Sequence, residues 1–280
     1  MQTAYTPVIL ELLNFPASTL TQKVCLISLR LFITSLKEKT SYDLTVPDNS
    51  INLQCKGKFK QYPMKIILTG ATGMVGEGVL RECLIHPSVE AVLIINRKPS
   101  GFTDPKLTEI IHKDFFDLSA VEFQLAGYDA CLFCLGVSSV GIKEHEYTRL
   151  TYDLTMNFAS TVSRMNPRMV FCYISGAGTD STEKGRIMWA RVKGKTENDL
   201  MKLPFKDVYA FRPGVLIPSE GAVNVLPAYK YVKWLIPAIK PLFPAFVGSL
   251  KELGKAMINV SLLECPQKVL NVRDIRKLSE

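Results

Sequence analysis

The chain of 280 residues has only three histidines, and its cysteines and acidic residues show no metal-site spacing, so we expect no metal centre. No basic run is interleaved with aromatic residues, and nucleic-acid binding is therefore not expected, although the net charge is +8. No apolar stretch is both long and uncharged enough for a membrane span, which needs about 20 residues. The positive charge suits a phosphorylated cofactor or another anionic partner.

The cysteines number seven, an odd count that gives no sign of a disulfide framework. Several fall in predicted buried elements, which is typical of reduced thiols, and we expect a cytoplasmic location. Cys131 and Cys134 form a C-x-x-C within the apolar run Ala130–Leu135. Residues three apart in a strand point to opposite faces, so we expect two small buried side chains here and no redox or metal pair.

Residues 1–63 differ from the rest of the chain and are expected to be an N-terminal appendage outside the fold. Their apolar stretch, Val24–Leu36, is short and carries Arg30, which argues against a membrane span. Two interpretations stand: an upstream extension, with Met64 as the natural start, or a targeting or regulatory arm. Residues 64–280 are expected to form one domain.

The segment from Lys65 to Gly76 predicts a strand, a glycine turn and the start of a helix, which is expected to end at His86-Pro87. This order forms a cradle for a dinucleotide pyrophosphate, because glycine allows close backbone approach and the helix N-terminus favours negative charge. The candidate cofactor contacts in this turn are Gly70, Thr72, Gly73, Met74, Val75 and Gly76.

The next predicted strand, Ala91–Asn96, is followed by Arg97 and Lys98. At this place an acid holds the ribose 2′-hydroxyl of NAD, whereas an arginine accommodates the 2′-phosphate of NADP. No acid stands near in the sequence, so Arg97 favours NADP, with NAD left open. The alternative is that both residues are solvated loop charges.

The remaining apolar patterns predict an α/β fold: a Rossmann-type, doubly wound parallel sheet with a small C-terminal cap. Further strands are predicted over Glu109–Asp114, Ala130–Leu135, Met169–Ser175, Asp207–Leu216 and, at an edge, Lys268–Val272. Helices are predicted over Leu118–Leu125, Glu144–Met165, Arg186–Leu200 and Leu250–Leu263, with a terminal turn from Asp274.

Four motifs carry a family resemblance: the T-G-A-T-G-x-x-G turn, Asp114-Phe115, the C-L-G ending in Leu135-Gly136, and Arg212-Pro213-Gly214. With them the chain resembles the short-chain dehydrogenase/reductase superfamily. The likeness is strongest to its extended and atypical members, the NAD-dependent epimerase/dehydratase-like proteins, and among these to the Tat-interacting oxidoreductase-like branch. The resemblance implies an NAD(P)-dependent oxidoreductase or epimerase-like enzyme. The further cofactor contacts it implies are Asp114, Phe115, Leu135, Gly136, Pro213 and Gly214.

In the family, a serine after the fifth strand and a Tyr-x-x-x-Lys pair carry catalysis, and the lysine also binds the nicotinamide ribose. Ser175 and Lys193 resemble the serine and the lysine, but Trp189 stands where the tyrosine would be. Indole donates a hydrogen bond and does not titrate near neutral pH. Three interpretations remain: an enzyme whose acid or base is Tyr173 or a water held by Ser175, an NADP-binding regulator or sensor without hydride transfer, and simple packing by Trp189.

Residues 229–247 form the most hydrophobic stretch of the C-terminal third, interrupted by prolines and lysines. A substrate lid or packed helix pair is favoured, and a homodimer or membrane-surface contact is the alternative. The expected partner is a small-molecule substrate of the carbonyl, alcohol or sugar-nucleotide type.

Overall fold

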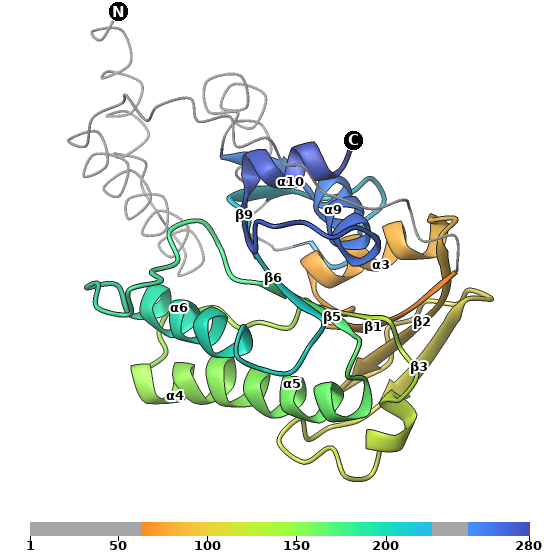
Figure 1. The fold of residues 1–280 in the computed structure, drawn as a ribbon, viewed down its shortest axis with the longest axis horizontal. Helices are drawn as coiled ribbons and strands as arrows, with labels where there is room; N and C mark the ends of the chain where they lie inside the picture. Colours follow the sequence, from red (N-terminus) through yellow and green to blue (C-terminus); the bar gives the residue numbers. More distant parts are fainter. Residues whose placement is uncertain (1–62, 226–245) are drawn as a thin grey trace, which may run out of the picture. The chain divides into compact units, whose positions relative to one another are not determined.

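The computed structural model describes residues 63–225 and 246–280, and their main feature is a seven-stranded sheet. The strand order is β3-β2-β1-β4-β5-β6-β9, and every neighbouring pair is parallel (Figure 1). The strands are β1 (Met64–Thr69), β2 (Val89–Asn96), β3 (Leu107–Ile111), β4 (Ala130–Phe133), β5 (Val170–Ile174), β6 (Asp207–Arg212) and β9 (Val269–Asn271). The predicted Rossmann-type α/β fold is confirmed.

Helices cover both faces of the sheet (Figure 1). One face carries α3 (Met74–Ile85), α9 (Leu250–Leu262) and α10 (Val272–Leu278), and the other carries α4 (Glu144–Thr148), α5 (Leu154–Met165) and α6 (Met188–Leu200). Alternation along β1 builds both cores: Ile66 and Leu68 pack toward α3 and α9, whereas Ile67 packs toward α5. All three side chains are fully buried, so the strand reads as a continuous apolar run.

The cysteines follow the same alternation. Cys131 belongs to the core on the α5 side, whereas Cys134 packs against the core on the α3 side. The prediction that this C-x-x-C is split between two faces is therefore confirmed. Cys83, Cys131, Cys134 and Cys172 are free, whereas Cys265 is disulfide-bonded. The expectation of reduced thiols thus holds for these four described cysteines and not for Cys265.

Several predicted elements differ at their ends or in kind. The expected helix over Leu118–Leu125 is only a 3-10 turn, Glu122–Leu125, and the long helix after it contains a π segment, Arg149–Asp153, between α4 and α5. The expected terminal turn is helix α10, which begins with a capping box of Asn271 and Asp274. Short polar segments are where tertiary contacts override local propensity.

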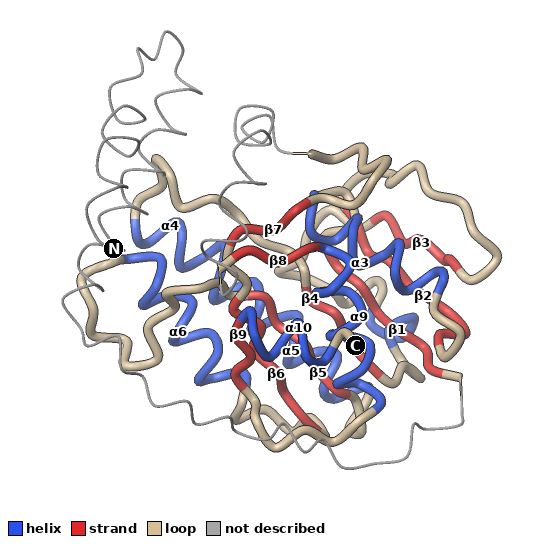
Figure 2. The backbone as a smooth tube through the Cα atoms, turned by 90° about the horizontal axis from the view of Figure 1, so that it is seen from above, coloured by secondary structure: helices blue, strands red, loops and turns tan. Residues whose placement is uncertain are grey.

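The predicted strand over Asp207–Leu216 is interrupted at Pro213-Gly214 and continues as β7 (Val215–Ile217). β7 pairs in parallel with β8 (Val247–Ser249), as Figure 2 shows, and α9 follows β8 directly. Residues 1–62, and all but the last two residues of 229–247, lie outside the described part, so the predictions for those segments stay predictions.

The helices α3 and α9 approach each other through glycines. A Cβ built at Gly78 of α3 would lie 2.6 Å from Cβ of Leu250, and one at Gly254 of α9 would lie 2.8 Å from Cγ of Glu82. Such distances leave no room for a side chain, because the nearest atoms lie close to the backbone. Close packing against α9 thus fixes the position of α3, the helix that begins at the glycine turn.

Gly78→Ala is expected to lower the free energy of unfolding by about 1–2 kcal/mol, because overpacking against Leu250 outweighs the gain in helix propensity. Urea unfolding of the purified protein measures the change. Gly136→Ala is the matched control, because a Cβ built at Gly136 meets nothing within 4 Å. Equal stability of the two variants would contradict the close contact.

Candidate cofactor and active site

The glycine turn joins β1, α3 and the end of β4 by direct backbone contact. Gly70 has a positive φ of 76°, and a Cβ there would lie 2.8 Å from the carbonyl oxygen of Cys134. A Cβ at Gly76 would lie 2.1 Å from the Gly70 carbonyl oxygen. No side chain caps the N-terminus of α3, whose N-cap residue is Gly73. The uncapped N-terminus of α3 thus lies beside closely packed glycine backbone, an arrangement that suits an anionic ligand such as a pyrophosphate.

The end of β4 lies beside this turn and is open. The backbone N–H of Leu135 donates to Oγ1 of Thr69 at 3.3 Å, which ties β4 to β1. A Cβ at Gly136 would meet no atom within 4 Å. From β1 the chain adds β2 and β3 on one side and then β4, β5 and β6 on the other, so the strand order reverses between β1 and β4. This switch point is where open α/β sheets bind ligands.

The end of β2 presents Arg97 and Lys98 as exposed side chains. An acid does lie near them, which the sequence prediction missed: Glu109 of β3 accepts 2.8 Å hydrogen bonds from the Asn96 side chain and the Ser100 backbone. Parallel pairing causes this, because Glu109 stands opposite Ile94 although it is distant in the sequence. Glu109 therefore shapes the loop that carries both basic residues.

The loop after β3 places Asp114 and Phe115 differently. Asp114 is exposed, and its Oδ1 accepts from the Phe116 backbone at 2.9 Å. His112 Nε2 lies 2.7 Å from the carbonyl oxygens of both Asp114 and Asp117, which fixes the turn. The Phe115 ring is buried against Phe158, with ring centroids 6.0 Å apart. The whole residue is 3% exposed, and its carbonyl oxygen accepts from the Asn157 side chain at 3.0 Å, so the Phe115 side chain is part of the core.

A buried acid stands in the first turn of α3, beside the glycine turn. Glu77 is fully buried and accepts hydrogen bonds from the backbones of Val223 and Asn224, at 2.9 and 2.7 Å, and from Arg81 at 2.9 Å. Burial by itself would raise the pKa of Glu77, but these hydrogen bonds hold it below its ordinary value of 4.5. Glu77 therefore fastens the segment after β7 to the helix of the cradle.

Lys193 reaches the carboxyl end of β5. Its Nζ donates to the carbonyl oxygen of Ser175 at 2.5 Å and approaches that of Ile174 at 3.4 Å. Burial lowers the pKa of Lys193 to about 8, against the attraction of Glu197, which raises it. The predicted pair of Ser175 and Lys193 is thus brought together, although through the serine carbonyl and not its hydroxyl.

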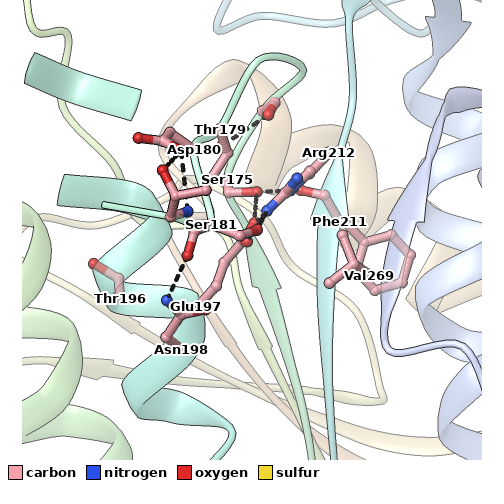
Figure 3. Close-up of polar contacts among 12 residues, drawn as sticks. Ser175, Thr179, Asp180, Ser181, Thr196, Glu197, Asn198, Phe211, Arg212 and Val269 are labelled. Atoms are coloured by element: carbon pink, nitrogen blue, oxygen red, sulfur yellow. Dashed lines mark hydrogen bonds and ion pairs between the residues drawn. The ribbon is translucent and has the colours of Figure 1, made fainter. Parts of the chain in front are cut away.

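The Ser175 hydroxyl is engaged elsewhere. It donates to Glu197 of α6, and its Oγ lies 3.1 Å from the carbonyl oxygen of Phe211. Arg212 pairs with the same carboxylate, with Nε 3.0 Å from Oε1. Figure 3 shows the three polar side chains converging between α6, β5 and β6. The sequence prediction missed Glu197, although its place one helical turn after Lys193 was a signal for it.

Trp189 and Tyr173 are the two aromatic residues that bear on proton transfer at this site. Trp189 is partly buried, and a Cβ built at Gly178 would lie 3.5 Å from its Cη2, so the indole stands over the loop after β5. Tyr173 is 2% exposed, within the core on the α5 side, and burial raises its pKa well above the ordinary value. A buried phenol of this kind is a poor acid or base near neutral pH.

The segment after β6 is held by its neighbours. The buried Pro213 accepts a 2.8 Å hydrogen bond at its carbonyl oxygen from the backbone of Ala177. A Cβ at Gly214 would lie 2.1 Å from the carbonyl oxygen of Phe246, so this glycine admits the start of β8. The close contact at Gly214 is with the chain itself, and the cofactor contact implied for this glycine stays a prediction.

The described residues, 63–225 and 246–280, contain neither a cluster of potential metal ligands nor a membrane-spanning helix. Within these ranges, no three of the histidines, cysteines and carboxylates gather in an arrangement that could hold a metal ion. The helices in the same ranges include none with the length and hydropathy of a membrane span.

Comparison with known proteins gives relatives but no family model that matches. Leucinostatins biosynthesis cluster protein T of Purpureocillium lilacinum is 28% identical over 229 residues, covering 69% of this chain and 83% of that protein. Protein FMP52, mitochondrial, of Meyerozyma guilliermondii is 24% identical over 206 residues, covering 71% and 86%. Protein HTATIP2 of Rattus norvegicus is 25% identical over 174 residues, covering 61% and 70%.

Solved structures share the fold at low identity. The UDP-N-acetylglucosamine 4-epimerase of Methanobrevibacter ruminantium superposes with a TM-score of 0.55 at 15% identity, covering 75% of this chain and 76% of that one. WbmG of Bordetella bronchiseptica, solved in complex with NAD, gives 0.53 at 14% identity, covering 78% and 77%. At such identities the likeness shows the fold alone.

The lowered pKa of Lys193 makes stability depend on pH. Between about pH 8 and the ordinary value of 10.5, the unfolded chain binds a proton at Lys193 that the folded chain does not. The free energy of unfolding should therefore gain a contribution as pH rises through this window. Urea unfolding across the window should show this rise in the wild type and in Lys251→Met, an exposed control, and its loss in Lys193→Met. Parallel curves for all three proteins would refute the shift.

The sheet order, the glycine turn and the relatives agree with one another. The turn between β1 and α3 has the predicted T-G-A-T-G-x-x-G sequence and the backbone contacts that this sequence requires. HTATIP2, a Tat-interacting protein, is among the relatives, as the predicted resemblance implied, and epimerases are among the structures of the same fold. The chain is therefore similar in sequence to HTATIP2 and to the FMP52 proteins and shares the fold of the epimerases, in agreement with the predicted resemblance to atypical short-chain dehydrogenases/reductases.

Proposed function

We propose that this chain binds a nicotinamide dinucleotide, with preference for NADP, and acts as an oxidoreductase on a small molecule. The observation that carries the proposal is the glycine turn at the switch point, where backbone packs on backbone at Gly70 and Gly76 and the N-terminus of α3 begins at Gly73 without a side-chain cap. The WbmG structure of the same fold contains NAD, which supports the choice of cofactor class. The preference for NADP rests on Arg97 and Lys98 at the end of β2.

The residues present fit such a cofactor. The turn of Gly70, Gly73 and Gly76 would hold the pyrophosphate, and Gly136 leaves open space beside it. Lys193 donates from α6 at the other half of the edge, where the nicotinamide ribose would lie. The other proposed cofactor contacts, through backbone or side chain, are Thr72, Met74, Val75, Asp114, Phe115, Leu135, Pro213 and Gly214.

A bound nicotinamide dinucleotide supplies hydride transfer, and the chain must supply the proton. Trp189 cannot exchange a proton near neutral pH, and Tyr173 is buried with a raised pKa. Lys193, with a pKa of about 8, is a group of this site that titrates near neutrality, directly or through a water. The substrate class remains a carbonyl, an alcohol or a sugar nucleotide, the last supported by the epimerase of the same fold.

A second candidate function is NADP binding without hydride transfer, as a regulator or sensor. Two specific observations favour it: Trp189 replaces the proton donor of the family, and the Ser175 hydroxyl is already donated to Glu197. A serine in this state can accept a hydrogen bond from a ligand but cannot donate one to a carbonyl oxygen.

The location of the protein belongs to the same proposal. A cytoplasmic location was expected from the sequence, whereas the FMP52 relatives carry the word mitochondrial in their names. We propose a cytoplasmic location. Fractionation of the native source, with antibody detection in the cytosolic and mitochondrial fractions, decides between the two.

Arg97→Ala should weaken NADPH binding by about tenfold or more and leave NADH binding within about twofold, because only NADPH carries the 2′-phosphate. Fluorescence titration of the purified protein with both dinucleotides measures this. Arg168→Ala is the matched control, an exposed arginine two residues before β5 at the amino edge of the sheet. Equal binding of NADPH and NADH by the wild type would remove the argument for NADP.

Trp189→Tyr should raise turnover by about 10- to 100-fold in an NADPH absorbance assay with a panel of carbonyl substrates, because it restores a titrating donor. Trp189→Phe is the control, since phenylalanine has the ring without the hydroxyl. Turnover in the wild type supports the oxidoreductase. Turnover in Trp189→Tyr alone supports the regulator instead.

A further inference from the structure

A buried ion pair closes the space between α6 and β6, close to the proposed nicotinamide site. Glu197 is 1% exposed, and the side chain of Arg212 is 19% exposed. The guanidinium meets the carboxylate with two nitrogens, Nε at 3.0 Å from Oε1 and Nη2 against Oε2 (Figure 3). This fork geometry fixes the direction of both side chains as well as their distance.

The pair also holds the ends of its neighbours. Arg212 donates to the hydroxyl of Ser181, in the loop between β5 and α6. Glu197 accepts from Ser175, directly after β5, so one carboxylate contacts residues at the ends of two adjacent strands. Figure 3 shows these side chains drawn together from three elements. Their relative positions are thus set by one cluster of hydrogen bonds.

Stability alone does not account for such a pair. Two buried charges lose their hydration, and apolar residues of similar volume are often as stable or more stable in their place. A buried ion pair is therefore weak support for a purely structural role. What the pair supplies in addition is a set of directional hydrogen bonds that join α6, the end of β6 and the segment after β5.

The segments that it orients are those of the proposed site. Lys193 precedes Glu197 by one turn of α6 and donates to the carbonyl oxygen of Ser175. Arg212 directly precedes Pro213, whose carbonyl oxygen accepts from Ala177 in the loop after β5. Glu197 therefore lies one helical turn from the lysine, and Arg212 lies directly before the proline segment.

We propose that Glu197 and Arg212 are positioning residues for the nicotinamide half of the dinucleotide site, an inference that rests on the proposed function. They hold Ser175, Lys193 and Pro213 in the arrangement that this half of the cofactor meets. Neither residue takes part in holding the adenosine half.

The sheet order separates the two halves. The adenosine half would lie over β1, β2 and β3, where the glycine turn and Arg97 stand, and the nicotinamide half over β4, β5 and β6. The described side-chain hydrogen bonds of Glu197 and Arg212 join the two residues to each other, to Ser175 and to Ser181. A change at the pair should therefore reach one half of the cofactor and spare the other.

The test compares two ligands on the full chain by isothermal titration calorimetry. NADPH probes both halves, and adenosine 2′,5′-bisphosphate probes the adenosine half alone. In the double variant Glu197→Met/Arg212→Met, which keeps volume and leaves no unpaired charge, NADPH affinity should fall by about tenfold or more. Affinity for adenosine 2′,5′-bisphosphate should stay within about twofold of the wild-type value.

Two further variants sharpen the comparison. Glu197→Gln keeps the shape of the side chain and removes its charge, and it should show the same selective loss if it folds. Asp199→Asn changes a carboxylate on the same helix that pairs with Lys195 and Lys202, and it should leave both affinities unchanged. Binding stoichiometry for adenosine 2′,5′-bisphosphate reports the folded fraction of each variant, so misfolding is recognised as a loss of sites.

The outcomes of these titrations distinguish failure of the inference from failure of the proposed function. Wild-type affinity for NADPH in the double variant, or an equal loss for both ligands at full stoichiometry, overturns the inference and leaves the proposed function standing. A wild-type protein that binds neither ligand overturns the proposed function, and the inference falls with it.

Discussion

The structure depends on a backbone contact that tolerates no side chain. The carbonyl oxygen of Gly70 occupies the place where a Cβ of Gly76 would be, and Gly70 itself lies against the carbonyl of Cys134. This contact sets α3 close to β1 and β4 at the point where the strand order reverses. Gly78 and Gly254 then let α9 support α3 from behind. The proposed phosphate cradle depends on this packing, because the packing places the uncapped N-terminus of α3 at the switch point.

The carboxyl edge of the sheet has two parts that are built differently. The proposed function assigns them to the two halves of the cofactor, as an adenosine side and a nicotinamide side. The adenosine side consists of backbone at the glycine turn and of exposed Arg97 and Lys98, with Glu109 shaping their loop. The nicotinamide side is a network of buried charge in which Lys193, Glu197 and Arg212 hold the ends of β5 and β6. Preorganised polar groups of this kind are typical of reaction centres, yet the family proton donor is replaced by Trp189.

The sequence predicted the parts whose signal is local. The strand, glycine turn and helix from Met64 to His86 were found because apolar runs and glycines specify them directly. The helix over Leu118–Leu125 was wrong in extent and the terminal turn wrong in kind, because tertiary contacts override local propensity in short segments. Likewise, the carboxylate of Glu109 was missed, since only parallel pairing brings β3 beside the end of β2.

The sequence by itself therefore determined the fold class, the glycine cradle and the departure at Trp189, because each is written in adjacent residues. Tertiary structure alone decided which groups meet. It placed Tyr173 in the core and brought the Ser175 hydroxyl within hydrogen-bond distance of Glu197. It also packed the carbonyl oxygen of Phe246 against Gly214. These contacts join residues distant in the chain, and the packing of helices on a parallel sheet is what brings them within hydrogen-bond distance.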